Sequence, residues 1–357
     1  MPLRGEDGLV AWLRQRTGGE GSLLGDDGAV LAGRREVVVT VDQQIEGVHF
    51  ASGLDPSVVA RRLLRVNLSD LAAMGAVPRE AFLALAAPPG FPHRRFFVAL
   101  LGEARRFGVR LAGGDLSRAA AVSASLTLLG ERVRGGRWLR RGQARPGDRL
   151  WLGGTLGESA LGCQLVARGA KWARGLVAIP RAAGVPPELR RAARRAVRRH
   201  LLPEPQLLLS RWLAARRRVA AIDVSDGLAR DLHRLCRASG VGAVLEADAL
   251  PVARGSDALS RALHQDWRAL ALSGGEDYVL LFTLPASAAP PDEFGCVAVG
   301  RVTRGPAIQM RTGGAMRPLR DMGFDHLAGG GRRAPVKRRA IARRPGRGRA
   351  ARRPPRR

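Results

Sequence analysis

Residues 66–76 read VNLSDLAAMGA and place an asparagine, a serine and an aspartate in an otherwise apolar segment. Upstream of it, Asp55 is followed by Pro56. An aspartate is a favourable N-cap, and a proline suits the first position of a helix because its fixed backbone angle is already helical. We therefore predict a helix that begins at this pair and runs towards Met74.

Asp70 belongs to a series of acidic residues that lie beside apolar segments, most of them next to a glycine. Six such clusters occur, at 25–28 (GDDG), 40–42 (TVD), 67–70 (NLSD), 113–115 (GGD), 223–227 (DVSDG) and 274–278 (GGEDY). Carboxylate oxygens are the ligands that Mg²⁺ prefers, and glycines let the backbone approach phosphate oxygens. Turn formation alone explains an aspartate or a glycine at any single position. The joint occurrence indicates magnesium–phosphate chemistry, but it names no reaction.

Strand and helix signals alternate through the chain. Segments that are β-branched or alternate with period two predict strands over 36–41, 122–128, 279–284 and 296–302. Apolar residues at helical spacing predict helices over 93–107 and 228–236, each followed by a glycine. A turn rich in Gly and Pro at 142–148 is the predicted boundary. We expect an α/β (α+β) fold with domains over 1–140 and 141–330.

The charge of the chain is strongly positive and unevenly distributed. The 357 residues carry a net charge of +29, and the basic residues are arginines except for Lys171 and Lys337. Thirteen basic residues and no acidic ones lie in 332–357. We expect residues 331–357 to be a disordered tail that binds polyanions nonspecifically. One tyrosine and an aromatic content of 4% leave little for the stacking of bases.

Several classes of protein are excluded by missing residues. Neither lysine lies in a P-loop, and the lysine and His-Arg-Asp motifs of protein kinases are absent. The three cysteines form no CxxC pair, which argues against a disulfide scaffold or a cysteine-built zinc site and fits a cytoplasmic protein. No apolar run reaches the roughly 18 residues that a membrane span needs.

Taken in order, the motifs resemble the thiamine-monophosphate kinase family of the aminoimidazole ribonucleotide synthetase-like superfamily. The combination of NLSDLAAMG, DVSDGL and SGGEDY is far more specific than any one piece, and the likeness spans about residues 6–328. It implies transfer of the γ-phosphoryl group of ATP to thiamine phosphate, directly and in line, with several Mg²⁺ ions. It also implies a homodimer whose N-terminal sheets pair, and a C-terminal α+β domain that completes the site.

The resemblance also implies roles for individual residues. Those matching the catalytic positions are Asp42, Asp115 and Asp223. The implied magnesium ligands are Asp27, Thr40, Val41, Asp42, Asp70, Asp115, Asp223 and Asp226. ATP would be contacted by Gly114, Asp115, Arg141 and Ser225, and thiamine phosphate by His49, Glu276 and Phe324. Val41 stands where many members have threonine, so a hydroxyl ligand would be lost if the side chain, rather than the backbone carbonyl, binds metal.

Two alternatives stay open. Another ATP-using enzyme of the superfamily is one, but the selenophosphate enzyme should have a reactive cysteine and a lysine near its N-terminus, and the first here are Cys163 and Lys171. The other is a basic nucleic-acid-binding protein, which the net charge favours. Deletion of 332–357 separates this second reading from the kinase.

Overall fold

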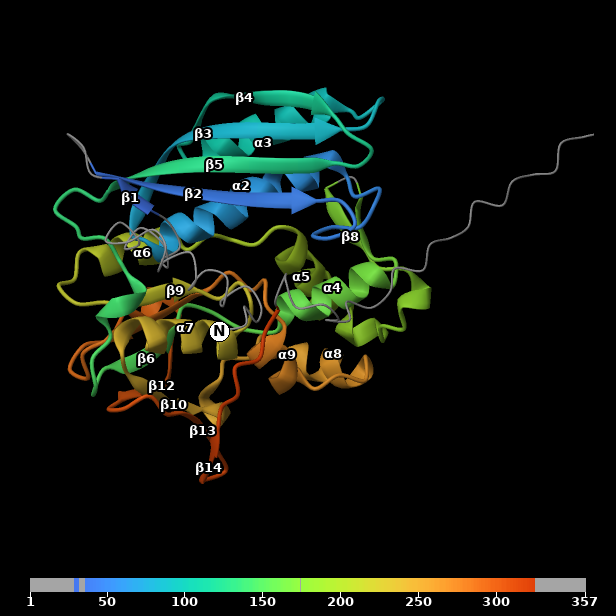
Figure 1. Ribbon diagram of the computed structural model, residues 1–357. Coiled ribbons are helices and arrows are strands. Elements are labelled where there is room, and N and C mark those ends of the chain that lie inside the picture. The colour runs from blue at the N-terminus through green and yellow to red at the C-terminus, as the bar shows by residue number, and fades with distance from the viewer. Residues whose placement is uncertain (1–28, 32–35, 174, 325–357) are drawn as a thin grey trace, which may run out of the picture.

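The computed structural model describes residues 29–31, 36–173 and 175–324, which form two main sheets with helices between and beside them (Figure 1). The first sheet has the strand order β1-β2-β5-β3-β4. Its strands are β1 (Ala29–Leu31), β2 (Val37–Ile45), β3 (Ala76–Ala87), β4 (Arg110–Arg118) and β5 (Ser123–Arg132). Neighbouring strands are antiparallel except β3 and β4, which are parallel and are joined through helix α3 (His93–Arg106).

Helix α2 (Pro56–Ala73) forms where the sequence predicts it. The Asp55 carboxylate accepts a hydrogen bond from the Ser57 amide at 3.0 Å, which confirms the predicted N-cap. Helices α2 and α3 pack on one face of the first sheet, and the leucines of α2 fill the core there. The predicted strands over 36–41 and 122–128 are confirmed as parts of β2 and β5.

The other face of the first sheet carries exposed apolar side chains. Val41 on β2, Thr127 on β5 and Phe82 on β3 are in register across the sheet, so they share a face. Val41 is 60% exposed and Phe82 is 42% exposed. Among the described residues no helix covers this row, which we call the open face.

The second sheet has the order β14-β13-β10-β12-β6-β11-β9, with only β10 and β13 parallel. Its strands are β6 (Arg149–Leu152), β9 (Ala221–Asp223), β10 (Gly242–Glu246), β11 (Leu280–Leu284), β12 (Val297–Thr303), β13 (Ile308–Thr312) and β14 (Ala315–Pro318). The predicted strands over 279–284 and 296–302 are confirmed as β11 and β12. The helix predicted over 228–236 is confirmed within α7 (Leu228–Ser239), which packs on this sheet.

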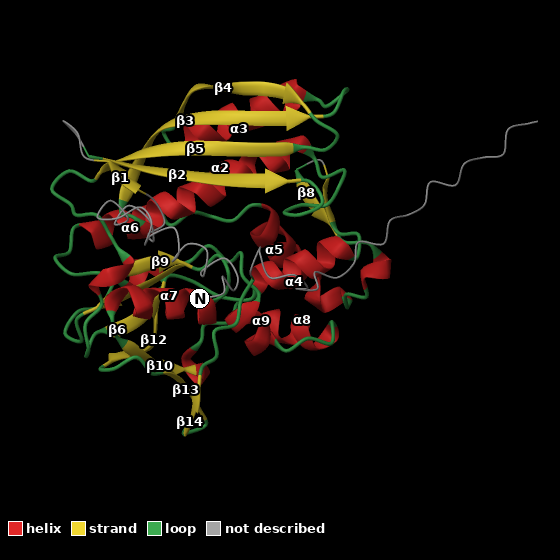
Figure 2. Cartoon of the chain, viewed as in Figure 1, coloured by secondary structure: helices red, strands yellow, loops and turns green. Residues whose placement is uncertain are grey.

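A helical layer stands beside the second sheet (Figure 2). It contains α4 (Glu158–Ala167), α5 (Arg190–Leu201), α8 (Ser256–Ala262) and α9 (Trp267–Ser273), together with the short strands β7 (Lys171–Ala173) and β8 (Leu176–Ala178). Helix α6 (Leu207–Ala214) packs against α2 and so lies between the two halves. In the described part of the chain, no helix is long and apolar enough to span a membrane. Asp27 and the tail 331–357 lie outside the described residues.

Candidate active site

The C-terminal half of α2 holds polar groups from both halves of the molecule. The Asn67 side chain accepts a hydrogen bond from the Asp42 amide of β2 at 3.1 Å and donates to the Leu63 carbonyl at 2.8 Å. The Ser69 hydroxyl donates to the Asp223 carboxylate, at the end of β9, at 2.7 Å. Both Asn67 and Ser69 are buried, so these bonds fix the two strands to the helix.

Asp70 completes this group from the next position of α2. Its carboxylate accepts a hydrogen bond from the hydroxyl of Thr40, a buried residue of β2. Residues 67–70 thus bring four of the predicted metal ligands, Thr40, Asp42, Asp70 and Asp223, to one short stretch of helix. Val41 lies between Thr40 and Asp42 on β2, and its side chain points to the open face. The side chain is therefore on the opposite face of β2 from the buried Thr40.

The pKa of Tyr278 depends on the charged residues around this group. Burial raises the pKa of Tyr278 well above its usual value, the nearby Arg62 lowers it, and the charges of Glu276, Asp42 and Asp223 raise it further. The carboxylates that raise this pKa come from β2, β9 and the 274–278 segment.

The 223–227 and 274–278 segments pair with each other at the edge of the second sheet. The Glu276 amide donates to the Ser225 carbonyl at 2.6 Å, and the Tyr278 amide donates to the Val224 carbonyl at 2.9 Å. Gly275 has φ +65°, and an added Cβ there would lie 2.6 Å from the Ser225 carbonyl oxygen. Glu276 and Tyr278 also have positive φ values, 58° and 50°, which are costly for side chains other than glycine. The pairing fixes the predicted ATP residue Ser225 beside the predicted substrate residue Glu276.

Asp226 belongs to a different group of charges. Its carboxylate pairs with Arg234 of α7, and its amide donates to the buried Asp231 carboxylate at 3.1 Å. Burial and the charge of Asp226 raise the pKa of Asp231 to about 7, while Arg234 and Arg141 act in the opposite direction. Arg141 lies near this second group, and its carbonyl accepts a hydrogen bond from the Ser239 hydroxyl at the end of α7 at 2.7 Å.

Two further predicted substrate residues, His49 and Phe324, are held in place by hydrogen bonds. The His49 ring nitrogen Nδ1 accepts from the Ile45 amide at 3.0 Å, at the turn that follows β2. The Phe324 amide donates to the Asp226 carbonyl at 3.1 Å, and the Phe324 carbonyl accepts from Arg230 of α7. Phe324 is thus fixed against the loop of the second group.

Asp115, like Asp226, is a predicted ligand that the structure does not bring to α2. It lies on the exposed edge strand β4, and strands β5 and β3 separate it from Asp42 in the sheet. Three inter-strand spacings of about 4.8 Å amount to roughly 14 Å. The neighbouring Gly114 has φ +154°, and an added Cβ would lie 1.9 Å from the Leu83 carbonyl oxygen. The close approach of β3 therefore demands a glycine there.

The donors at α2 suit a hard cation, because they are carboxylate and hydroxyl oxygens. Within the part of the chain that the structure describes, however, no three His, Cys, Asp or Glu side chains stand close enough to hold an ion by themselves. Asp27, another predicted ligand, is outside that part. A surface hollow of about 710 Å³ lies between α2 and α3, around Arg61 and Arg95, and none of the predicted site residues lines it.

Comparison with known proteins identifies the family of the chain. Residues 25–131 match the family model of AIR synthase related protein, N-terminal domain, and residues 145–311 match that of the C-terminal domain. Thiamine-monophosphate kinase of Salmonella typhimurium is 38% identical over 272 residues, which cover 73% of this chain and 76% of that protein. The chain belongs to the thiamine-monophosphate kinase family.

Other members match over more of their length. Thiamine-monophosphate kinase of Synechococcus elongatus is 35% identical over 340 residues, 90% of this chain and 96% of the relative. The solved structure of AaThiL complexed with AMPPCP and TMP superposes with a TM-score of 0.79 and 27% identity, covering 90% of this chain and 97% of that one. The predicted two-domain fold of this family is therefore confirmed.

The sequence did not reveal every residue that shapes the site. Asn67 and Ser69 stand inside a quoted motif, but only Asp70 suggested a role. Arg62 and His200, which contact Glu276 at 2.6 and 3.3 Å, gave no signal because they are a single arginine among many and a histidine without ligand spacing.

Proposed function

We propose that this protein transfers the γ-phosphoryl group of ATP to thiamine phosphate, giving thiamine diphosphate and ADP. An oxygen of the acceptor phosphate attacks the γ-phosphorus while the bond to the β,γ-bridging oxygen breaks, and ADP leaves. The observation that carries the proposal is the gathering of Asp42, Asp70 and Asp223 by residues 67–70, in a chain of this family. A relative described with AMPPCP and TMP supports both substrates.

Magnesium is part of the proposal because the donor set fits it. The ligands we assign are Asp27, Thr40, the backbone of Val41, Asp42, Asp70, Asp115, Asp223 and Asp226. Bound Mg²⁺ would offset the negative charge of the triphosphate and of the transferring group. The protein's own residues contribute positioning: Asn67 holds the backbone of Asp42, Ser69 holds the Asp223 carboxylate, and Asp226 has to exchange its pairing with Arg234 for a metal.

The remaining residues divide between the two substrates. We assign Gly114, Arg141 and Ser225 to ATP, and His49, Glu276 and Phe324 to thiamine phosphate. Gly114 allows a close backbone approach, and Arg141 supplies positive charge beside the 223–227 loop. A carboxylate and a flat ring suit the aminopyrimidine and thiazolium of thiamine phosphate. Residues 1–140 and 141–330 would be the two domains that share this site, in a cytoplasmic enzyme.

We also propose that two copies pair through their N-terminal sheets. The open face exposes Val41 and Phe82, and β4 is an exposed edge strand. Pairing would cover both features. Asp115 is in register with Ala84, two residues along β3 from Phe82, so it lies on the open face, and we propose that in this pairing it serves the partner's site.

Hybrid dimers test this pairing. Asp42→Asn and Asp115→Asn chains, each inactive alone, are mixed after unfolding and refolding. If Asp115 acts on the partner's site, each mixed dimer has one intact site and regains about half of the activity of a wild-type dimer. Absence of any recovery, with mixed dimers shown to form, would place Asp115 in the site of its own chain.

An acceptor panel tests the reaction. With Mg-ATP, only thiamine phosphate should yield thiamine diphosphate, and chelation of Mg²⁺ should stop it. Thiamine, selenide and the aminoimidazole precursor serve as competing acceptors, and consumption of ATP with one of them in place of thiamine phosphate would reassign the chain within its superfamily.

A further inference from the structure

Arg62, in the first half of α2, is buried and contacts three separate parts of the chain. Its Nη2 lies 2.6 Å from Oε1 of Glu276, and its Nε donates to the Gln44 side chain of β2 at 3.1 Å. Its Nη1 donates to the carbonyl of His200 at the end of α5. The side chain is 1% exposed. Because the guanidinium is planar and its donors are fixed in a fork, these contacts leave it little freedom.

Glu276 is held from its other side as well. Nδ1 of His200 lies 3.3 Å from Oε2 of Glu276 and 3.2 Å from the Ser159 hydroxyl. The Glu276 backbone is fixed by its bond to the Ser225 carbonyl. Each carboxylate oxygen thus has a cationic or N–H partner, and the side chain remains 20% exposed. A carboxylate oxygen has a further lone pair, so the exposed side can still accept a hydrogen bond from a ligand.

Helix α2 links this carboxylate to the group at its other end. Arg62 and Asp70 are eight residues apart on one helix, which is about 12 Å along the axis. The same helix holds Asp42 and Asp223 through Asn67 and Ser69. The helix therefore fixes the distance between Glu276 and the carboxylates that we assign to magnesium.

We propose that Arg62 is a positioning residue for the acceptor substrate: with His200, it holds the Glu276 carboxylate so that this group accepts a hydrogen bond from thiamine phosphate at a set distance from the phosphoryl donor. The inference rests on the proposed function, and on Glu276 contacting thiamine phosphate. In-line transfer needs such alignment, because a small displacement of the acceptor oxygen slows the reaction steeply.

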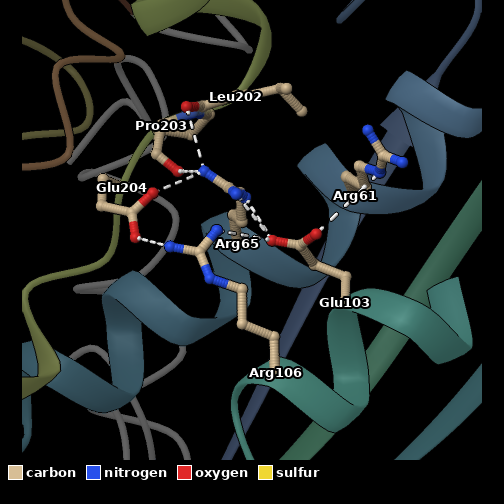
Figure 3. Close-up of polar contacts among 7 residues, drawn as sticks. All are labelled: Arg61, Arg65, Glu103, Arg106, Leu202, Pro203 and Glu204. Carbon is tan, nitrogen blue, oxygen red and sulfur yellow. Dashed lines mark hydrogen bonds and ion pairs between the residues drawn. The ribbon is translucent and has the colours of Figure 1, made fainter. Parts of the chain in front are cut away.

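The chain offers a matched control one turn further along α2 (Figure 3). Arg65 is also buried, pairs with Glu103 at 2.6 Å and Glu204 at 2.7 Å, and donates to the Pro203 carbonyl at 3.1 Å. It links α2 to α3 and to the segment after α5, but it does not contact Glu276. Arg65→Gln therefore removes a comparable buried network without touching the proposed acceptor site.

The test compares steady-state constants for both substrates in Arg62→Gln, Arg65→Gln, Glu276→Gln and the double variant Arg62→Gln/Glu276→Gln. We expect Arg62→Gln to raise the KM for thiamine phosphate at least about tenfold, the scale of a lost supporting contact, and to leave the KM for ATP within about threefold. Arg65→Gln should lower thermal stability similarly without this split. In the Glu276→Gln background, Arg62→Gln should add less than about twofold, because both changes act through one carboxylate.

Several results would overturn the inference. These are an equal rise in both KM values, a rise no larger than that of Arg65→Gln, or effects that multiply in the double variant. An unchanged KM in Glu276→Gln would overturn it too, while leaving the reaction intact. Failure of the wild type to make thiamine diphosphate would instead remove the proposed function. If Arg62→Gln does not fold, Arg62→Lys, which keeps the charge but loses the fork, should show the same split between substrates at a smaller size.

Discussion

At the scale of single residues, Ser69 shows how one hydroxyl connects the two halves of the site. It lies on α2, which packs on the first sheet, and it donates to Asp223 of the second sheet at 2.7 Å. Both residues are 1% exposed. The sequence indicated a role for Asp223 and for Asp70, the residue after Ser69, because carboxylates bind metal. It could not point to the serine, since a serine in a helix is usually unremarkable.

Replacing Asp223 by asparagine removes the negative charge of the side chain but keeps its hydrogen bond with Ser69. Asp223→Asn keeps an acceptor oxygen for Ser69, so the fold should persist, but it removes a negative charge that we assign to metal binding. Turnover should fall by about 10²-fold or more, and Asp42→Asn should behave likewise. Asp257→Asn, which changes an exposed pair with Arg261, is the control and should leave kcat unaltered. Turnover within a few-fold of wild type in both site variants would contradict the metal assignment.

His200 predicts a pH dependence of stability. Burial alone lowers its pKa, but hydrogen bonds with Cys163 and Glu276 and the charge of Glu276 outweigh this and raise the pKa to about 9. A raised pKa in the folded state stabilises the protein below the unfolded value of about 6.5, and this contribution is lost as pH rises to about 9. Its upper limit is about 3 kcal/mol.

Urea unfolding at pH 6 and pH 9.5 measures this effect. The urea concentration at the midpoint of unfolding should be lower at pH 9.5 than at pH 6 for the wild type. The decrease should be much smaller for His200→Gln. Equal falls in the two proteins would show that His200 is not protonated in the folded state.

At the scale of elements, capping residues and apolar alternation predicted individual helices and strands. The Asp55–Pro56 pair gave the start of α2, and alternation gave β2, β5, β11 and β12, because capping and burial act over a few residues. The order of strands in the sheet depends on contacts far apart in sequence. For that reason the sequence could not show that β5 and β3 separate Asp42 from Asp115, or that Arg234 of α7 pairs with Asp226.

The close packing of β3 against β4 predicts that alanine at two adjacent glycines of β4 has different effects on stability. Gly114→Ala would place a Cβ 1.9 Å from the Leu83 carbonyl oxygen at a φ of +154°, so we expect a loss of roughly 2 kcal/mol or more in the free energy of unfolding. Gly113→Ala would meet only the Phe82 ring, at 3.3 Å, and should cost far less. Chemical denaturation of both variants checks this, and equal costs would contradict the backbone argument.

At the scale of the whole molecule, the net charge of +29 and the fold point to different partners. The tail carries 13 of the positive charges and lies outside the described residues. Deleting 332–357 should leave kinase activity intact and weaken polyanion binding with a smaller dependence on salt, because fewer counterions are released. Loss of activity on deletion would show that the tail belongs to the catalytic unit.

In the proposed reaction, carboxylates carried by both sheets hold the Mg²⁺ ions that bind ATP, and the terminal phosphoryl group of ATP passes to thiamine phosphate. The most direct measurement follows γ-³³P from ATP in the presence of Mg²⁺ and thiamine phosphate, with the products separated by chromatography. We expect label in the terminal phosphate of thiamine diphosphate, with one ADP formed for each molecule of thiamine diphosphate. Label recovered only as inorganic phosphate, or no thiamine diphosphate at all, would contradict it.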